Sequence, residues 1–379
     1  MREAAFCSAA SIVAHPACPC RIRARMSPGG QAAGGQFLQS NRLLPPLPAC
    51  PAMTTFPFLE ALGHGITAID TGFMRPRFDA AYLVVEGGHA AYVDSGINDA
   101  LPRLLAALDV QGLDRGAVDY VIVTHVHLDH AGAAGLLMQQ LPNARLVVHP
   151  RGAPHMIDPS ALVAGASAVY GAEEVARTYG TVQPVPAERV LASHDGMVLD
   201  LAGRPLLLIE TPGHARHHHC IWDERSRGWF TGDTFGLSYP EFRTPGGRYV
   251  LPTTTPVQFE PGPLKTSIAR MLEKRPDCMY LTHYSRIDEV DSFAEQLFEQ
   301  IDAMVALARP LATAGDRDQQ LRHGLAQLYR RRLRAAGSVL SDAQIDELLT
   351  VDVELNAQGL GVWLDREARN AQAPAPGAR

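Results

Sequence analysis

One segment of the sequence joins the pattern of a buried strand to an unusual concentration of imidazole and carboxylate side chains. Residues 119–124 (DYVIVT) form a short, largely apolar run, which is typical of a strand that is buried on both faces. This run leads directly into His125, His127, Asp129 and His130, which are four potential metal ligands in six positions. Alternate residues of an extended segment point the same way, so His125 and His127 can hold one metal ion. Asp129 and His130 come as the chain turns into the next helix, and they can face a second ion alongside.

Short apolar or β-branched runs recur along the chain, and segments with helical spacing separate many of them. We expect strands over residues 66–69, 81–86, 90–94, 119–124, 144–148, 205–210, 220–223, 228–230 and 278–281. We expect helices over residues 102–108, 132–141, 293–307, 319–336 and 341–349, with a mostly helical insert over 154–180. Gly87 and Gly88 predict a hairpin turn, and Ser341 with Gln344 predicts a capping box. Apolar strands that alternate with helices predict an α/β layered fold.

The N-terminal segment differs in composition from the rest of the chain. Residues 1–52 are rich in Ala, Pro, Cys, Arg and Gly, and their only acidic residue is Glu3. Such a segment buries too little apolar surface to offset its ordering entropy, so we expect it to be disordered. It loosely resembles an organelle transit peptide, but we favour a start of translation at Met53 or Met26. We expect a main α/β domain over 53–287, a helical extension over 288–365 and a flexible tail over 366–379.

Composition and charge narrow the classes of function. The 379 residues carry a formal net charge of −6, which argues against a nucleic-acid partner because such surfaces are usually basic. No apolar run reaches the roughly 18 residues that predict a membrane-spanning helix. The six cysteines do not form a disulfide framework, since four of them lie in the N-terminal segment. These features predict a cytoplasmic protein with neither a membrane nor a nucleic-acid partner.

The segment HVHLDH resembles the HxHxDH signature of the metallo-β-lactamase superfamily. Other motifs of that family follow at plausible distances: VDSG with Asp94, TPGH with His214, TGD with Asp233 and LTHY with His283. Each follows an expected strand, and the resemblance covers the chain from about Ile66 to Arg286. It implies a four-layer αββα sandwich, two mixed sheets flanked by helices, whose catalytic domain is 53–287 and whose site lies at one edge. The helices beyond would form a C-terminal extension.

The resemblance also implies a centre of two divalent metal ions with a hydroxide between them. Seven side chains are implied as ligands: His125, His127 and His214 for the first metal, Asp129, His130 and His283 for the second, and Asp233 for both. Imidazole and carboxylate ligands suit zinc, and they suit iron or manganese as well. A divalent metal lowers the pKa of bound water to about 7. Asp129, which can take a proton during turnover, and the bridging Asp233 are the expected catalytic residues.

Other residues are expected to support this centre or to contact a substrate. Asp94 and His218 would orient the metal ligands and their loops through hydrogen bonds. Tyr239 and Tyr284 are hydroxyl candidates for a substrate contact, and Tyr170 belongs to a helical insert that can cover the site. Residues 235–240 and 252–256, which are rich in Ser, Thr, Tyr and Pro, are expected to line the pocket.

The predicted activity is hydrolysis of an ester-like bond in a small molecule. Asp233 places the chain nearer the glyoxalase II, lactonase and thioesterase branches than the true zinc β-lactamases, so a thioester or a lactone is the expected substrate. Three alternatives remain: an iron enzyme similar to persulfide dioxygenases, a nuclease of the same fold, and a regulatory or binding protein that uses its metal site little. The motifs predict no particular oligomeric state.

Overall fold

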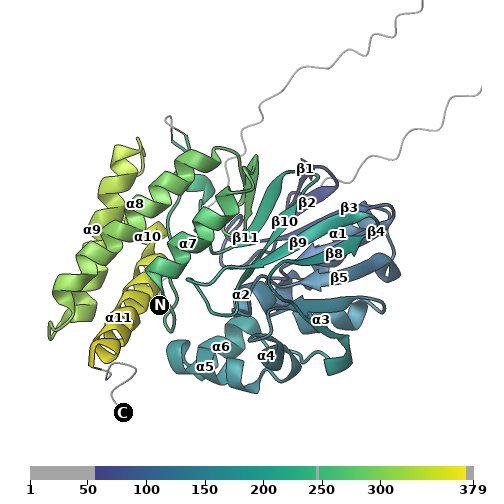
Figure 1. Cartoon of the computed structure of the whole chain (residues 1–379), viewed down its shortest axis with the longest axis horizontal. Helices are drawn as coiled ribbons and strands as arrows, with labels where there is room; N and C mark the ends of the chain where they lie inside the picture. The colour runs from purple at the N-terminus through teal and green to yellow at the C-terminus, as the bar shows by residue number, and fades with distance from the viewer. Residues whose placement is uncertain (1–55, 245–246, 373–379) are drawn as a thin grey trace, which may run out of the picture. The chain divides into compact units, whose positions relative to one another are not determined.

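The computed structural model describes residues 56–244 and 247–372 (Figure 1). Two mixed β-sheets form the centre of the fold. The first sheet has the strand order β1-β2-β3-β4-β5-β6-β7, with bounds Leu59–Gly63, Ile66–Asp70, Ala80–Glu86, His89–Val93, Val118–Ile122, Arg145–Val148 and Val190–Ala192. The second sheet has the order β13-β12-β11-β10-β9-β8, and β8 to β13 span Met197–Leu201, Arg204–Glu210, His219–Asp223, Gly228–Gly232, Cys278–Leu281 and Ser285–Ile287.

The helices fall into an N-terminal set beside the first sheet and a C-terminal set beside the second. The first set comprises α1 to α6, over Leu101–Val110, Leu128–Ala131, Ala134–Gln140, Ala153–Ile157, Ser160–Tyr170 and Ala172–Tyr179. The second set comprises α7 to α11, over Pro261–Leu272, Val290–Ala308, Arg317–Ala335, Asp342–Leu348 and Thr350–Gln372. Within the described residues, no helix is both long and apolar enough to cross a membrane.

Successive side chains of a strand point to opposite faces of its sheet and so belong to different layers of the core. In β3, Tyr82 and Val84 belong to a core between the two sheets, and the intervening Leu83 belongs to a second core beneath α1 and α3. In β10, Ile221 faces the same inter-sheet core, whereas Trp222 packs in a third core with the C-terminal helices. Helices therefore cover the outer face of each sheet, and the expected αββα sandwich with a C-terminal helical extension is confirmed.

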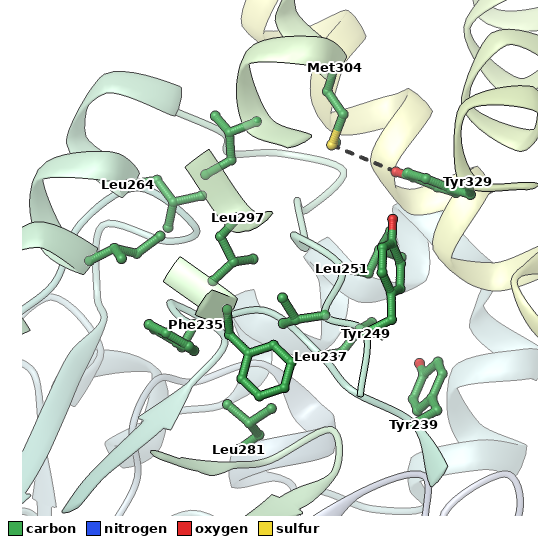
Figure 2. Close-up of a cluster of buried hydrophobic side chains, with 14 of the residues drawn as sticks. Phe235, Leu237, Tyr239, Tyr249, Leu251, Leu264, Leu281, Leu297, Met304 and Tyr329 are labelled. Carbon is green, nitrogen blue, oxygen red and sulfur yellow. Dashed lines mark hydrogen bonds between the residues drawn. The ribbon is translucent and has the colours of Figure 1, made fainter. Parts of the chain in front are cut away.

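The third core joins the second sheet to the C-terminal helices. Figure 2 shows Leu297 and Met304 of α8 and Tyr329 of α9 around the segment that follows β11, with Phe235 and Leu237. The hydroxyl of Tyr329 lies 3.8 Å from the sulfur of Met304. Because these side chains are buried together, the C-terminal helices and the sandwich share one continuous apolar core.

Most expected elements are present, and several were missed or misplaced. The expected capping box is confirmed, since the Ser341 side chain accepts from the Gln344 amide and Gln344 reaches back. The insert over 154–180 is three helices, broken before Ser160 and again at Gly171, where φ is +90°. No strand or helix was predicted from the sequence at β1, β7, β8, β13 or α7, and α11 was covered only by the predicted helical extension. β1 and β8 are edge strands; β1 is largely exposed, and β8 exposes the apolar Val198. The flexible tail was predicted from residue 366, but α11 continues to Gln372. The predicted disordered segment 1–52 lies outside the described residues.

Helix α11 is held against the segment that follows β11. The Asn356 side chain accepts a hydrogen bond from the Thr254 amide at 2.7 Å and donates to the Tyr329 hydroxyl at 2.8 Å and the Pro252 carbonyl at 3.2 Å. One turn on, Gly359 allows close approach, because a Cβ there would lie 2.1 Å from the Thr254 hydroxyl oxygen.

We predict opposite effects for two alanine substitutions in this helix. Gly359→Ala should lower the free energy of unfolding by about 2 kcal/mol, because the added methyl overpacks the contact with Thr254. Gly361→Ala is the matched control, since the nearest atom to its Cβ would be 3.7 Å away. It should raise the free energy of unfolding by up to about 1 kcal/mol through helix propensity. Urea unfolding measures both, and equal stabilisation by the two would contradict the packing described here.

Candidate metal centre

The seven side chains predicted as metal ligands meet at one edge of the sandwich, although they come from four separate segments of the chain. His125 and His127 follow β5, and Asp129 and His130 lie in the short helix α2. The other three follow strands of the second sheet. Three groups of donor atoms each lie within 4.8 Å of one another: His125, His127 and His214; His125, His130 and Asp233; and Asp129, His130 and His283.

Asp233 lies between the two ends of this cluster. Its Oδ2 is 3.3 Å from His214 Nε2, and its Oδ1 is 3.4 Å from His130 Nε2 and 3.8 Å from His283 Nε2. On the far side, Asp129 Oδ2 lies 3.5 Å from His283 Nε2. One carboxylate oxygen of Asp233 therefore faces each half of the cluster, which is the arrangement expected of a bridging ligand.

Some donor atoms lie at hydrogen-bonding distance from one another, such as His125 Nε2 at 2.7 Å from His127 Nδ1. By contrast, His130 Nε2 and Asp233 Oδ1 are buried and have no hydrogen-bond partner among the described residues. Unsatisfied buried polar atoms are destabilising and rare, so such a pair calls for a ligand. Imidazole nitrogens and carboxylate oxygens are the donors that zinc, iron and manganese accept.

The electrostatics favour the protonation states that ligands need at some positions and oppose them at others. Burial, together with the neighbouring imidazoles, holds the pKa of His125 and of His127 well below the ordinary value. Burial opposes the charge on Asp233, but His130, His214 and His283 outweigh it and hold its pKa well below the usual range. At neutral pH the two histidines are thus neutral and the aspartate is ionised, as metal binding requires. At His130 and His283 burial opposes the charged ring, but Asp233 and Asp129 outweigh it and raise the pKa, to about 9 for His283, so metal binding must displace a proton from these two rings.

Asp94 organises the cluster from behind. Its carboxylate accepts hydrogen bonds from the Thr124 amide at 2.7 Å, the Thr124 hydroxyl at 3.0 Å and the Thr282 hydroxyl at 3.0 Å. It also lies 2.9 Å from His130 Nδ1, which leaves Nε2 of that ring directed at the cluster. Asp94 thereby ties the ends of β5 and β12 together and fixes the orientation of His130.

His218 supports a loop and belongs to none of the three donor groups. Its Nδ1 lies 2.8 Å from the Thr211 hydroxyl, and its Nε2 accepts from the Asp233 amide at 3.3 Å. The ring also stacks on His125, with centroids 4.7 Å apart. These contacts hold the two loops that carry His214 and Asp233.

A cavity of about 860 Å³ opens over the cluster. Tyr170 and Tyr239 line it, as expected, but the Tyr239 hydroxyl is already directed at Asp352 of α11, 3.2 Å away. Tyr284, the other expected substrate contact, packs in the core between the sheets and does not line the cavity. It follows His283 directly, yet of these two residues only His283 lines the cavity. Leu237, Tyr239 and Thr253 to Pro256 supply lining from the two segments expected to do so.

The sequence profile described as the Metallo-beta-lactamase superfamily matches residues 74–283. The match contains Asp94, the seven clustered side chains and most of both sheets. This chain belongs to the metallo-β-lactamase superfamily. Its matched region ends before α8, so the family profile does not extend over α8 to α11.

Relatives within the superfamily include an archaeal protein and two named enzymes. The metallo-β-lactamase fold-containing protein ST1585 of Sulfurisphaera tokodaii is 26% identical over 225 residues, 58% of this chain and 78% of that protein. Its crystal structure matches with a TM-score of 0.56 at 22% identity, covering 79% of this chain and 98% of that one. An atrochrysone carboxyl ACP thioesterase of Aspergillus fumigatus is 27% identical over 164 residues, 43% of this chain and 42% of the thioesterase. A hydroxyacylglutathione hydrolase of Aeromonas hydrophila is 27% identical over 161 residues, 42% of this chain and 48% of the hydrolase. The chain thus matches less than half the length of either enzyme.

Several residues beside this superfamily site escaped the sequence analysis. The Phe78 carbonyl lies 3.0 Å from His283 Nδ1 and orients that ring, a role that a backbone atom cannot reveal in a sequence. The neighbouring Asp79 is fully buried, and burial raises its pKa to about 7. Thr253, which was expected only to line the pocket, also places its hydroxyl 3.0 Å from His214 Nδ1. Asp352 reaches the cavity from a helix that begins well beyond the motifs, so no local signal marks it.

We predict that Asp94→Asn weakens metal binding while every proposed ligand stays in place. Metal affinity should fall about 10- to 100-fold, because outer partners of metal ligands contribute that much. Competition with a chromophoric chelator measures the affinity. Asp119→Asn, at a partly exposed aspartate paired with His89 on the surface, is the control. Equal affinities in the two variants would show that the contacts of Asp94 do not matter for metal binding.

Proposed function

We propose that the protein is a metal-dependent hydrolase that cleaves an ester-like bond, a thioester or a lactone, in a small molecule. One observation carries the proposal: Asp233 presents one carboxylate oxygen to each half of a buried imidazole and carboxylate cluster. The cluster forms the floor of a cavity large enough for a small molecule. This geometry suits a two-metal site with His125, His127 and His214 on one side and Asp129, His130 and His283 on the other.

Zinc is the proposed metal, with iron and manganese as alternatives that the same donors suit. When bound, two divalent ions supply an activated water as the nucleophile and polarise the carbonyl that it attacks. The buried, pre-oriented side chains described above would keep the ligand atoms in place during turnover, which avoids reorganisation in the transition state.

Asp129 is the proposed proton carrier. Its side chain is 26% exposed and lines the cavity, whereas the His130 beside it is completely buried. A carboxylate at this position can take the proton of the attacking water and return it to the leaving sulfur or oxygen. His130 and His283 favour its ionised form and outweigh the effect of burial, so they hold the pKa of Asp129 well below its usual range.

The names of two relatives support the proposal that the bond cleaved is ester-like. One is named a thioesterase and the other a hydroxyacylglutathione hydrolase. Since the matches cover less than half of each enzyme, the substrates of those enzymes do not carry over to this chain.

Hydrolysis assays on the zinc-reconstituted protein test the proposal. We expect turnover of a simple thioester or lactone, and Asp129→Asn should lower kcat by at least about 100-fold, since positioned proton transfer contributes that much. Asp109→Asn, at an exposed site on α1, is the control and should keep wild-type activity. Bound iron with oxygen consumption on persulfides and no hydrolysis would contradict the proposal, as would cleavage of RNA alone.

A further inference from the structure

The C-terminal helix α11 forms one wall of the cavity. Val351, Asp352, Leu355 and Asn356 line it, and their spacing places them on one face of the helix. This helix lies outside the residues that match the superfamily profile. The wall is therefore a feature of this chain's own extension, and its chemistry is not fixed by the family motifs.

Asp352 brings a carboxylate into the cavity through a defined set of contacts. The Tyr239 hydroxyl donates to it at 3.2 Å, and the Tyr239 ring stacks on Phe78 with centroids 5.2 Å apart. Phe78 in turn meets His283 edge-on, with centroids 5.3 Å apart. Asp352 thus sits two aromatic rings away from the metal cluster, where it can meet part of a substrate without being a ligand.

The position of this carboxylate is built into the fold. Asn356, one turn further along α11, is hydrogen-bonded to the Thr254 amide. The adjacent Thr253 places its hydroxyl 3.0 Å from His214 Nδ1 and 3.3 Å from the Asp233 carbonyl. The segment that holds α11 in place therefore also supports two of the proposed metal ligands.

The cavity wall offers little to an anionic group. Beyond the proposed ligands, its acidic residues are Asp99, Glu174 and Asp352, and among the described residues Arg177 is the only arginine or lysine that lines it. Arg177 is already paired with Glu174, with its Nε 3.1 Å from the carboxylate. Arg75 lies behind Tyr239, 4.3 Å from its ring centroid, and is not part of the lining.

The remaining lining is largely apolar. Leu162, Ala166 and Val169 of α5 line it, and Leu355 lines it from α11. Phe73 and Leu128 add to the same surface. An uncharged alkyl or aryl arm would bury apolar area here without leaving a charge unpaired.

We propose that Asp352 is a specificity residue that rejects substrates with an anionic arm and reserves the cavity for neutral esters, thioesters or lactones with an apolar arm. The inference rests on the proposed function and narrows its substrate class. Burial raises the pKa of Asp352, but only to about 6, which is below neutral pH; the carboxylate that faces the cavity therefore repels an anion in a partly desolvated space.

Binding of two unreactive thioethers tests this charge filter. S-decyl coenzyme A carries an anionic arm, and S-decyl N-acetylcysteamine is its neutral counterpart. Calorimetry on the zinc-loaded full chain should give a Kd at least about ten-fold lower for the neutral thioether. Asp352→Asn should narrow that ratio at least about three-fold, and Asp352→Glu, which keeps the charge, should retain the preference. Glu354→Gln, on the same helix but paired with Arg322, is the matched control.

The outcomes separate this inference from the proposed reaction, because a thioether contains no bond that a hydrolase would cleave. Equal Kd values for the two thioethers in the wild type, or a ratio that Asp352→Asn leaves unchanged, would overturn the charge filter even if thioesters are hydrolysed. Shortening the alkyl chain from decyl to methyl should weaken binding of the neutral thioether more than about 100-fold. Binding that is independent of chain length would overturn the apolar-arm assignment.

Discussion

Burying a cluster of imidazole and carboxylate groups at the edge of the sandwich is the constraint on which the rest of this structure depends. Such groups are tolerated only where each polar atom finds a partner. The outward-facing atoms find theirs in the protein: Asp94 for His130, the Phe78 carbonyl for His283 and the Thr253 hydroxyl for His214. The inward-facing atoms are left directed at one another, and His130 Nε2 and Asp233 Oδ1 have no hydrogen-bond partner in the part of the chain that the structure describes. Ordinary hydrogen bonds thus fix the orientation of the proposed ligand side chains before a metal binds.

The same constraint links the C-terminal helices to the chemistry. The segment 252–256 supports His214 on one side and receives Asn356 of α11 on the other. The extension shares a core with the second sheet, so it is part of the folded body that holds the site. A helix outside the family profile can therefore change which substrates reach the cluster without altering the ligands.

Sequence reasoning went furthest where a motif and a strand pattern coincide. The apolar run 119–124 predicts a buried strand, and the potential ligands begin directly after it at His125. The sandwich and the clustered residues could therefore be predicted from the sequence. It failed where position depends on tertiary contacts. Tyr284 adjoins a proposed ligand yet packs between the sheets, while Asp352 is separated from the last motif by α8, α9 and α10 and lines the cavity. In the edge strand β8, Val198 is exposed whereas Leu199 and Leu201 are buried, so the alternation of burial is not visible in the apolar sequence MVLDL.

The metal content of the purified chain tests the central claim most directly. Elemental analysis after reconstitution and removal of loosely bound ions should find about two divalent ions per chain, as expected for paired sites that share one carboxylate. His214→Ala and His283→Ala should each reduce that stoichiometry, because they remove a ligand from opposite halves of the cluster. A chain that retains no metal under these conditions would contradict the account of the cluster as a two-metal centre.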